Sequence, residues 1–528
     1  MASLSLQPAR LSVYALTLLV IVPMLVLLAA WHQQEWATWQ HLVDTILWRL
    51  VGNTLLLMIG VGIGVLLLGV SLAWCVATLE FPGRRTLEWA LLLPLAMPAY
   101  VLAFVVVDTI GFAGPLQTQL RDWIPGFSGV DTRHPLWVIA TLSLVFFPYV
   151  YMLARLAFMA QGRAVLEQAR ILGCSPTRAF YTVALPMARP GIVAGLALAL
   201  METLADFGAV SVFNFDTFTT AIYKSWYGLF NLTAAAQLAS LLLVFVFFAL
   251  WLEQRHRGKS RFSELGGQRL IRARPRHGWL ISVFGFTVLG LAFVLPVGRL
   301  LYWAIDLGSV QADPRFWSLT WRTLSLGAMA AGMTLVLATW LSWVQRHQPS
   351  SSLRGAVRLA TLGYALPGSV LAVGIMLSFT HIEAFAANWG WQLPLVGSLA
   401  ALLLAYLVRF LAVAFGPIDH ALQQVRPRLV DAARTLGLSP SQTLWRLYIP
   451  MMLPGLTAAI LLVGIDVMKE MPATLLLRPF GWDTLAVRIY EFTAEGEWQR
   501  AALPSLALVG LGLIPVYLLM RRQIKGRL

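Results

Sequence analysis

Residues 167–191 read EQARILGCSPTRAFYTVALPMARPG, a polar stretch with glycines and prolines that lies between two long apolar runs. Residues 431–455 read DAARTLGLSPSQTLWRLYIPMMLPG and align with the first stretch without a gap. Matching residues are 264 positions apart, as Gly173 and Gly437 show. The chain therefore contains an internal duplication whose period is half its length.

The composition is that of a membrane protein. Of the 528 residues, 59% are hydrophobic and 12% are charged, and the mean hydropathy is +0.73. Such a chain is too apolar for a water-soluble globular protein, and many of its apolar runs approach the roughly 20 residues that a bilayer requires. Spanning segments must satisfy their own backbone hydrogen bonds, and continuous apolar runs favour helices over a barrel. The sequence therefore predicts an all-α polytopic membrane protein.

The apolar runs predict about twelve transmembrane helices. We expect the first run to be a retained span and not a cleaved signal peptide, because it has about 20 residues and no clear cleavage site. The predicted spans lie near residues 12–31, 51–79, 88–108, 135–158, 190–212, 232–252, 279–303, 319–344, 356–380, 395–418, 453–476 and 501–520.

The duplication extends beyond the two polar stretches. Two shorter matches flank them: PAYVLA (98–103) with PGSVLA (367–372), and Asp216-Thr217 with Asp483-Thr484. Each half is expected to hold six spans, and an even number makes the two repeats parallel and not inverted. The predicted domains are a first transmembrane domain (1–252), a basic cytoplasmic linker (253–278) and a second transmembrane domain (279–528).

The distribution of basic residues predicts the orientation. If the N-terminus is cytoplasmic, the loops on that side carry 25 Lys and Arg residues and the opposite loops carry eight. Cytoplasmic loops of membrane proteins show such an excess. We therefore expect both termini, the linker and both polar stretches on the cytoplasmic side. This bias accounts for the net charge of +15, and the sequence has no zinc-ligand spacing or separate basic domain that would indicate nucleic-acid binding.

Each polar stretch is expected to form a helix-turn-helix at the membrane surface. In the first copy, Glu167 suits the N-terminal end of a short helix, and Gly173 can end that helix in a left-handed conformation. Ser175 and Pro176 suit the N-cap and the first position of a second helix, which Pro186 is expected to end. One such copy is also typical of a plain interfacial connection. Two copies on the same side favour a pair of docking sites for a two-fold symmetric partner.

Both copies resemble the EAA loop of binding-protein-dependent ABC transporter permeases, which has an acidic residue, small residues, a glycine six positions after the acid and a hydrophobic-Pro ending. The first copy departs from this pattern at Gln168, and the second has Asp431 for Glu and Ile449 for Leu. The resemblance covers essentially the whole chain. It implies the fold of a type I ABC importer permease, in which each loop is a coupling helix seated in a cleft of a cytoplasmic ATPase. The implied coupling residues are Glu167, Ala169, Gly173 and Pro186, and Asp431, Ala433, Gly437 and Pro450.

The sequence carries no ATPase signature of its own. Gly258-Lys259-Ser260 is the fragment nearest to a phosphate-binding loop, but Glu253 stands where the first glycine is required. The motifs HExxH, CxxC and GxSxG do not occur, which argues against an enzyme. We therefore expect a transporter subunit that binds no cofactor itself, with ATP and magnesium held by a separate ATPase dimer.

Four carboxylates inside predicted spans are candidates for the substrate pathway, because charged groups in a membrane are costly and usually functional. Glu202 and Asp206 are four residues apart in the fifth span, and Asp466 and Glu470 have the same spacing in the eleventh. Each pair would then share one face of a helix. The alternative is a structural salt-bridge network around Lys469. No metal ligand is firmly assigned.

The carboxylates and the resemblance together favour ferric iron as the substrate. Residues 202–223 and 469–491 resemble segments of fused ferric-iron permeases, which work with a periplasmic iron-binding protein, and carboxylate oxygen suits this ion. Permeases for thiamine, polyamines or phosphonates share the same plan and are the alternatives. The resemblance implies alternating access in a bacterial inner membrane, with the binding protein on the outer loops 109–134, 211–231 and 477–500.

A twelve-helix secondary transporter, driven by a proton or sodium gradient, is the alternative from another class. It would account for the parallel duplication and the carboxylates inside the spans. It has no use for two cytoplasmic helix-turn-helix loops, so the sequence favours the ATP-driven importer.

Overall fold

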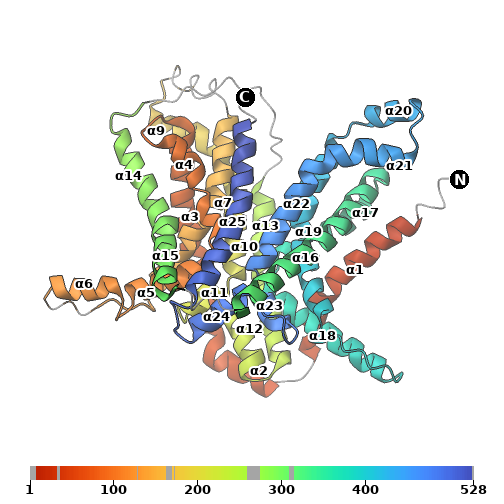
Figure 1. Ribbon diagram of the computed structural model, residues 1–528, viewed down its shortest axis with the longest axis horizontal. Coiled ribbons are helices and arrows are strands. Elements are labelled where there is room, and N and C mark those ends of the chain that lie inside the picture. Colours follow the sequence, from red (N-terminus) through yellow and green to blue (C-terminus); the bar gives the residue numbers. More distant parts are fainter. Residues whose placement is uncertain are drawn as a thin grey trace. The chain divides into compact units, whose positions relative to one another are not determined.

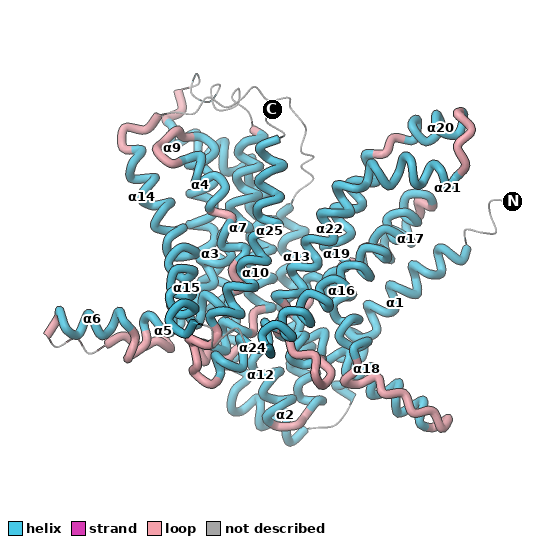
Figure 2. Tube along the Cα trace, in the orientation of Figure 1, coloured by secondary structure: helices cyan, strands magenta, loops and turns pink. Residues whose placement is uncertain are grey.

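The protein is described by a computed structural model that covers residues 7–32, 36–125, 127, 129–161, 169, 171, 173–257, 274–308 and 314–525. Every regular element in these ranges is a helix, and the helices are joined mostly by short loops (Figures 1 and 2). The predicted all-α class is confirmed.

The element boundaries follow the chain closely, with α-helices separated by turns of other helical types. The α-helices are α1 (Gln7–Ala29), α2 (Trp36–Leu42), α3 (Trp48–Thr78), α4 (Arg84–Ala90), α5 (Ala99–Ile110), α6 (Pro115–Trp123), α7 (Pro135–Ala160), α9 (Pro176–Ala179), α10 (Leu185–Ala205), α11 (Gly208–Val212), α12 (Phe218–Tyr223), α13 (Leu232–Arg257), α14 (Gly278–Leu289), α15 (Leu295–Leu307), α16 (Pro314–His347), α17 (Ser351–Ala360), α18 (Gly368–Ala387), α19 (Leu399–Gln424), α20 (Pro427–Thr435), α21 (Pro440–Thr443), α22 (Ile449–Lys469), α23 (Pro472–Leu477), α24 (Leu485–Ala494) and α25 (Ala502–Lys525). The π-helical turns are η2 (Val43–Leu47), η4 (Phe180–Ala184), η5 (Lys224–Gly228), η6 (Gly290–Val294) and η9 (Leu444–Tyr448), and the 3-10 turns are η1 (Ala30–His32), η3 (Leu93–Ala96) and η8 (Leu362–Ala365).

Eleven helical segments in the described part of the chain are long and apolar enough to cross a membrane. They correspond to the first eleven predicted spans. A shorter apolar helix, Ala502–Leu518, lies where the sequence predicts the twelfth. The chain is therefore a multi-pass membrane protein.

The helices form two compact units. Unit 1 comprises Met1–Trp39, Ile222–Leu241 and Ala312–Arg488, and unit 2 comprises Gln40–Ala221, Leu242–Gln311 and Ile489–Leu528. Within unit 1, α1 packs against α17 and α18, and within unit 2, α15 packs against α25. Each unit therefore contains helices from both halves of the sequence. The division into domains at 252 and 279 stays a prediction about the two sequence repeats.

The third span of each repeat begins with a break at a proline. Pro98 and Pro367 both have extended backbone angles and directly precede α5 and α18. Proline lacks an N–H and disfavours helical geometry at the residue before it, so a helix that starts after it cannot continue backward. The prediction of continuous spans over 88–108 and 356–380 is therefore wrong at their N-terminal ends.

The span after each polar stretch packs tightly on the span before it. A Cβ atom added at Gly191 in α10 would lie 2.9 Å from the carbonyl oxygen of Leu153 in α7. A Cβ atom added at Gly455 in α22 would lie 2.5 Å from the carbonyl oxygen of Pro417 in α19. The two residues of the second contact each lie 264 positions after those of the first. Glycines at such positions let membrane helices approach closely. The duplicated sequence thus fixes the same helix pair in both units.

Candidate functional site

The second polar stretch forms the helix-turn-helix that the sequence predicts. Helix α20 ends at Thr435, and Gly437 follows with a φ of 79° in the left-handed region. The N–H of Leu438 donates to the carbonyl of Ala433 at 3.1 Å, which closes the end of the helix. Ser439 then caps α21, because its hydroxyl accepts the N–H of Gln442 at 3.2 Å.

The first polar stretch has the same turn. Glu167 lies outside the described residues, so its predicted place at the start of the first helix stays a prediction. Gly173 has a φ of 82°, and the N–H of Cys174 donates to the carbonyl of Ala169 at 3.0 Å. The hydroxyl of Ser175 accepts the N–H of Arg178 at 3.3 Å. The predicted turn geometry is therefore the same in both copies.

The loops expose the surface that a docking partner would need. A Cβ atom added at Gly173 or Gly437 would meet no atom within 4 Å, so both glycines border open space. Asp431 is exposed, whereas Ala433 is buried. Leu436 is 81% exposed, and Ile171 in the first copy is 83% exposed. These two aliphatic side chains are not among the predicted coupling residues; the signal for them in the sequence is an apolar residue within two positions of a turn glycine.

The second loop helix continues into the following span. In both copies the residue before the proline donates its N–H to a carbonyl five residues back, on Phe180 in the first and Leu444 in the second. Pro186 and Pro450 follow these π-helical turns at the start of α10 and α22. A proline ring crowds the carbonyl four residues back, and the wider turn accommodates it. The prediction that these prolines end the second helix is therefore wrong, and Figure 1 shows α21 leading directly into α22.

Two of the four predicted pathway carboxylates stand at helix breaks. Asp206 follows the last residue of α10 with extended backbone angles, and Glu470 does the same after α22. The Asp206 carboxylate accepts the N–H of Val210 at 3.1 Å, and the Glu470 carboxylate accepts the N–H of Ala473 at 3.2 Å. Each acid therefore accepts a backbone N–H from the first turn of the short helix after the break. The prediction that 190–212 and 453–476 are continuous spans is therefore wrong, because α10 ends at Ala205 and α22 ends at Lys469. The two acids of each pair consequently do not share one face of a continuous helix, as the i,i+4 spacing had predicted.

Glu470 is also half of a buried ion pair. Its Oε2 lies 3.3 Å from Nε of Arg409 in α19, and the two side chains are 6% and 8% exposed. Arg409 also donates to the carbonyl of Leu366 at 3.1 Å. Glu470 is therefore part of an ion pair with Arg409. The predicted alternative, a salt-bridge network around Lys469, stays a prediction. An arginine in the apolar run LAYLVRFLAV was the signal that was missed.

The other two predicted carboxylates remain inside their spans. Glu202 lies in α10 of unit 2, and Asp466 lies in α22 of unit 1; both are partly exposed, as is Asp206. Within the described ranges, no three His, Cys, Asp or Glu side chains come together as a metal site.

A solvent-open cavity of ≈ 400 Å³ lies in unit 2, and part of its lining comes from residues that follow Asp206 in the sequence. Its lining includes Ser211 of α11 together with Tyr490, Thr493 and Glu495. These side chains offer a hydroxyl-rich surface with one carboxylate. Glu495 makes no side-chain hydrogen bond or ion pair with any described residue, whereas its neighbour Glu497 is paired with Arg500 at 2.7 Å. This segment is a predicted outer loop, but Glu495 is not among the predicted site residues.

Curated relatives of the chain are transport permeases. The chain is 29% identical to the Fe(3+)-transport system permease protein FbpB 2 of Haemophilus influenzae over 90% of both chains. It is 32% identical to the molybdenum transport system permease protein ModB of Escherichia coli over 28% of this chain and 62% of that protein. It is 25% identical to the putative 2-aminoethylphosphonate transport system permease protein PhnV of Salmonella typhimurium over 38% of this chain and 71% of that protein.

A family model matches both halves of the chain. The model describes the inner membrane component of binding-protein-dependent transport systems, and it matches residues 65–258 and 349–525, which together exceed half of the chain. Each matched segment contains one turn glycine with a positive φ, Gly173 or Gly437, and one helix break at an acidic residue. The chain therefore belongs to the family of binding-protein-dependent transport system inner membrane components and is the permease subunit of an ABC importer.

Proposed function

We propose that this permease imports ferric iron. The supporting observation is the likeness, over 90% of both chains, to a permease named for Fe(3+) transport. The relatives named for molybdenum and 2-aminoethylphosphonate match only 28% and 38% of this chain.

The charge of the candidate pathway supports a cation. Glu202, Asp206 and Asp466 are partly exposed carboxylates in or next to α10 and α22. Carboxylates attract a hard cation and supply the oxygen ligands that ferric iron prefers, whereas they repel oxyanions such as molybdate. We therefore assign these three residues to the pathway and give Glu470 a structural role, because Arg409 already neutralises it.

The cavity of unit 2 is the proposed entrance to this pathway. Its carboxylate, Glu495, has no protein partner among the described residues, and Tyr490 and Ser211 add hydroxyl oxygens. A transported ion must be held weakly enough to leave. One carboxylate with hydroxyls satisfies this need better than a closed set of metal ligands. The loops predicted on the outer face, 211–231 and 477–500, contribute the lining, so a binding protein docked there would deliver its ion into the cavity.

The coupling loops are the proposed contacts with the ATPase dimer. Residues Gly173 and Gly437 leave open space at the turn, and Ile171 and Leu436 offer apolar side chains to a protein cleft. In this mechanism, ATP closes the ATPase dimer and the two loops move with it. The helices that continue from the loops through η4 and η9 then carry the motion to the breaks at Asp206 and Glu470. The chain binds no cofactor, and both termini face the cytoplasm.

A complementation experiment tests the substrate. Cells that lack this permease are given the full-length chain, and the initial rates of ferric iron, molybdate, thiamine and 2-aminoethylphosphonate uptake are measured with radiolabelled substrates. We expect the chain to restore ferric iron uptake alone. Restored uptake of another substrate without ferric iron would refute the proposal and identify the alternative.

A pair of variants tests the entrance. Glu495→Gln is expected to lower ferric iron uptake about tenfold at a limiting iron concentration, which corresponds to about 1.4 kcal/mol. Glu497→Gln is the matched control, because Glu497 is two residues away and paired with Arg500. Equal rates for the two variants, at equal amounts in the membrane, would remove the cavity from the pathway and leave the substrate assignment intact.

A further inference from the structure

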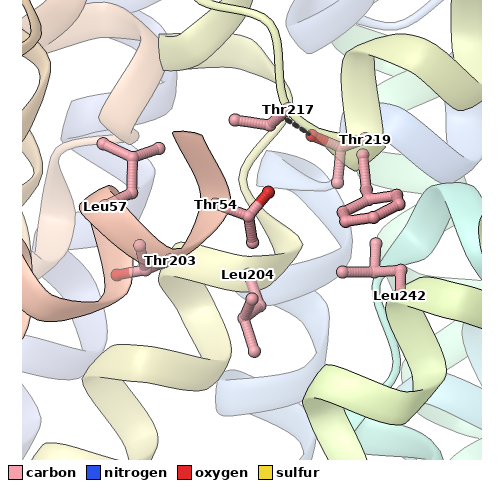
Figure 3. Close-up of a pocket in the computed structure, with 8 residues that line it drawn as sticks. Thr54, Leu57, Thr203, Leu204, Thr217, Thr219 and Leu242 are labelled. Atoms are coloured by element: carbon pink, nitrogen blue, oxygen red, sulfur yellow. Dashed lines mark hydrogen bonds between the residues drawn. The ribbon is translucent and has the colours of Figure 1, made fainter. Parts of the chain in front are cut away.

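A small internal cavity lies beside the Asp206 break in unit 2. Thr54 of α3 lines it from one side, Thr217 and Thr219 line it from another, and apolar side chains such as Leu242 close it (Figure 3). The cavity leaves ≈ 10 Å³ for the centre of a water molecule, close to the minimum that one water needs. Thr54 is 5% exposed, and its hydroxyl has no hydrogen-bond partner among the described residues.

The other repeat shows what Thr54 lacks. Thr323 in unit 1 lies 269 positions after Thr54, the same separation as between Pro98 and Pro367. The Thr323 hydroxyl accepts the N–H of Leu485 at 2.9 Å and donates to a carbonyl one turn earlier in its own helix at 2.8 Å. The equivalent hydroxyl in unit 2 makes neither bond, and the cavity stands in their place. An unpaired hydroxyl in a buried site costs free energy, so a partner is expected there.

The neighbouring hydrogen bonds fix the direction of any bond into the cavity. Thr219 donates its hydroxyl proton to the carbonyl of Asp206 at 2.7 Å. The 2.9 Å bond between the hydroxyls of Thr217 and Thr219 must then use the proton of Thr217. Thr217 keeps a free lone pair as an acceptor, and Thr54 keeps both its proton and its lone pairs. Figure 3 shows the Thr54 hydroxyl on the side of the cavity where Thr217 and Thr219 lie.

We infer that this cavity binds one water molecule, which accepts the proton of Thr54 and donates to Thr217. The result is a continuous chain of hydrogen bonds from α3 to the carbonyl of Asp206. The loop after α11 is also held to α3 directly, because Asn53 donates to the carbonyl of Asp216 at 2.8 Å. The first repeat therefore holds this loop through Asn53 and through a water on Thr54, whereas in the second repeat the hydroxyl of Thr323 binds the backbone N–H of Leu485 directly. The inference does not depend on the transported substrate.

The sign of a stability change tests this inference. The purified full-length permease is unfolded by heat as wild type, Thr54→Val, Thr54→Ser and Thr323→Val. If water fills the cavity, Thr54→Val removes its donor and lowers the midpoint by about 2 °C, while Thr54→Ser stays close to wild type. Thr323→Val lowers the midpoint in either case, because it leaves the Leu485 N–H unpaired, and so confirms the sensitivity of the assay.

A dry cavity gives the opposite sign. Thr54→Val would then replace an unpaired hydroxyl by a methyl group of the same shape, and the midpoint would rise or stay unchanged. Either result overturns the inference. An electron cryo-microscopy map that resolves waters provides the direct measurement: density between Thr54 and Thr217 in wild type, lost in Thr54→Val, is expected. A wild-type map with resolved waters elsewhere and an empty cavity would also overturn it.

Discussion

The Arg409–Glu470 ion pair predicts a specific pattern of stability changes. The charged atoms are 3.3 Å apart, and both side chains are more than nine-tenths buried. Glu470→Gln keeps an oxygen that can accept the Ala473 N–H, so it removes the charge and little else. The buried guanidinium of Arg409 would then lose the counter-charge of Glu470, and breaking a buried ion pair costs about 3–5 kcal/mol. The double variant Arg409→Met, Glu470→Gln removes both charges and is expected to regain most of this loss.

Thermal unfolding and transport together distinguish a structural role of Glu470 from a role in the pathway. Wild type, both single variants and the double variant are purified, and their unfolding midpoints are compared with their iron uptake per folded molecule. We expect both single variants to unfold several degrees lower and the double variant to unfold near wild type with most of its uptake retained. A Glu470→Gln variant that is as stable as wild type would refute the structural reasoning, and a stable but inactive double variant would return Glu470 to the pathway.

Three further perturbations follow from the geometry. Gly437→Trp is expected to abolish copurification of an ATPase, whereas Gly437→Asn should retain it, because asparagine tolerates the left-handed φ of 79°. Equal copurification of the two variants would show that the turn at Gly437 does not contact the ATPase. Asp206→Asn combined with Glu202→Gln is expected to lower ferric iron uptake at unchanged membrane levels, and unchanged uptake would give both residues a purely structural role. Gln117 is 1% exposed and donates to the carbonyls of Ile110 and Val130 at 2.6 and 2.7 Å, so Gln117→Ala should speed proteolysis of the loop at 109–134 in right-side-out vesicles; an unchanged rate would show that these bonds do not hold the loop.

The sequence by itself determined the features that depend on local chemistry. Runs of apolar residues predicted the spans, because a bilayer leaves a backbone few alternatives to a helix. The turn at Gly437 and the cap at Ser439 were also predictable, because left-handed angles and capping hydroxyls involve only a few neighbouring residues. The duplication was visible without any structure, since it is a property of the amino-acid sequence alone.

Only the tertiary structure decided the features that depend on partners distant in sequence. The sequence showed Glu470 inside an apolar run, but its role depends on Arg409, 61 positions earlier, which reaches it only when α19 packs beside the break after α22. Thr54 and Thr323 occupy equivalent positions, yet one hydroxyl has a backbone partner and the other faces a cavity. The membership of α1 in unit 1 is equally invisible in its apolar sequence. Local propensity cannot encode these outcomes, because each depends on which surfaces meet when the helices pack.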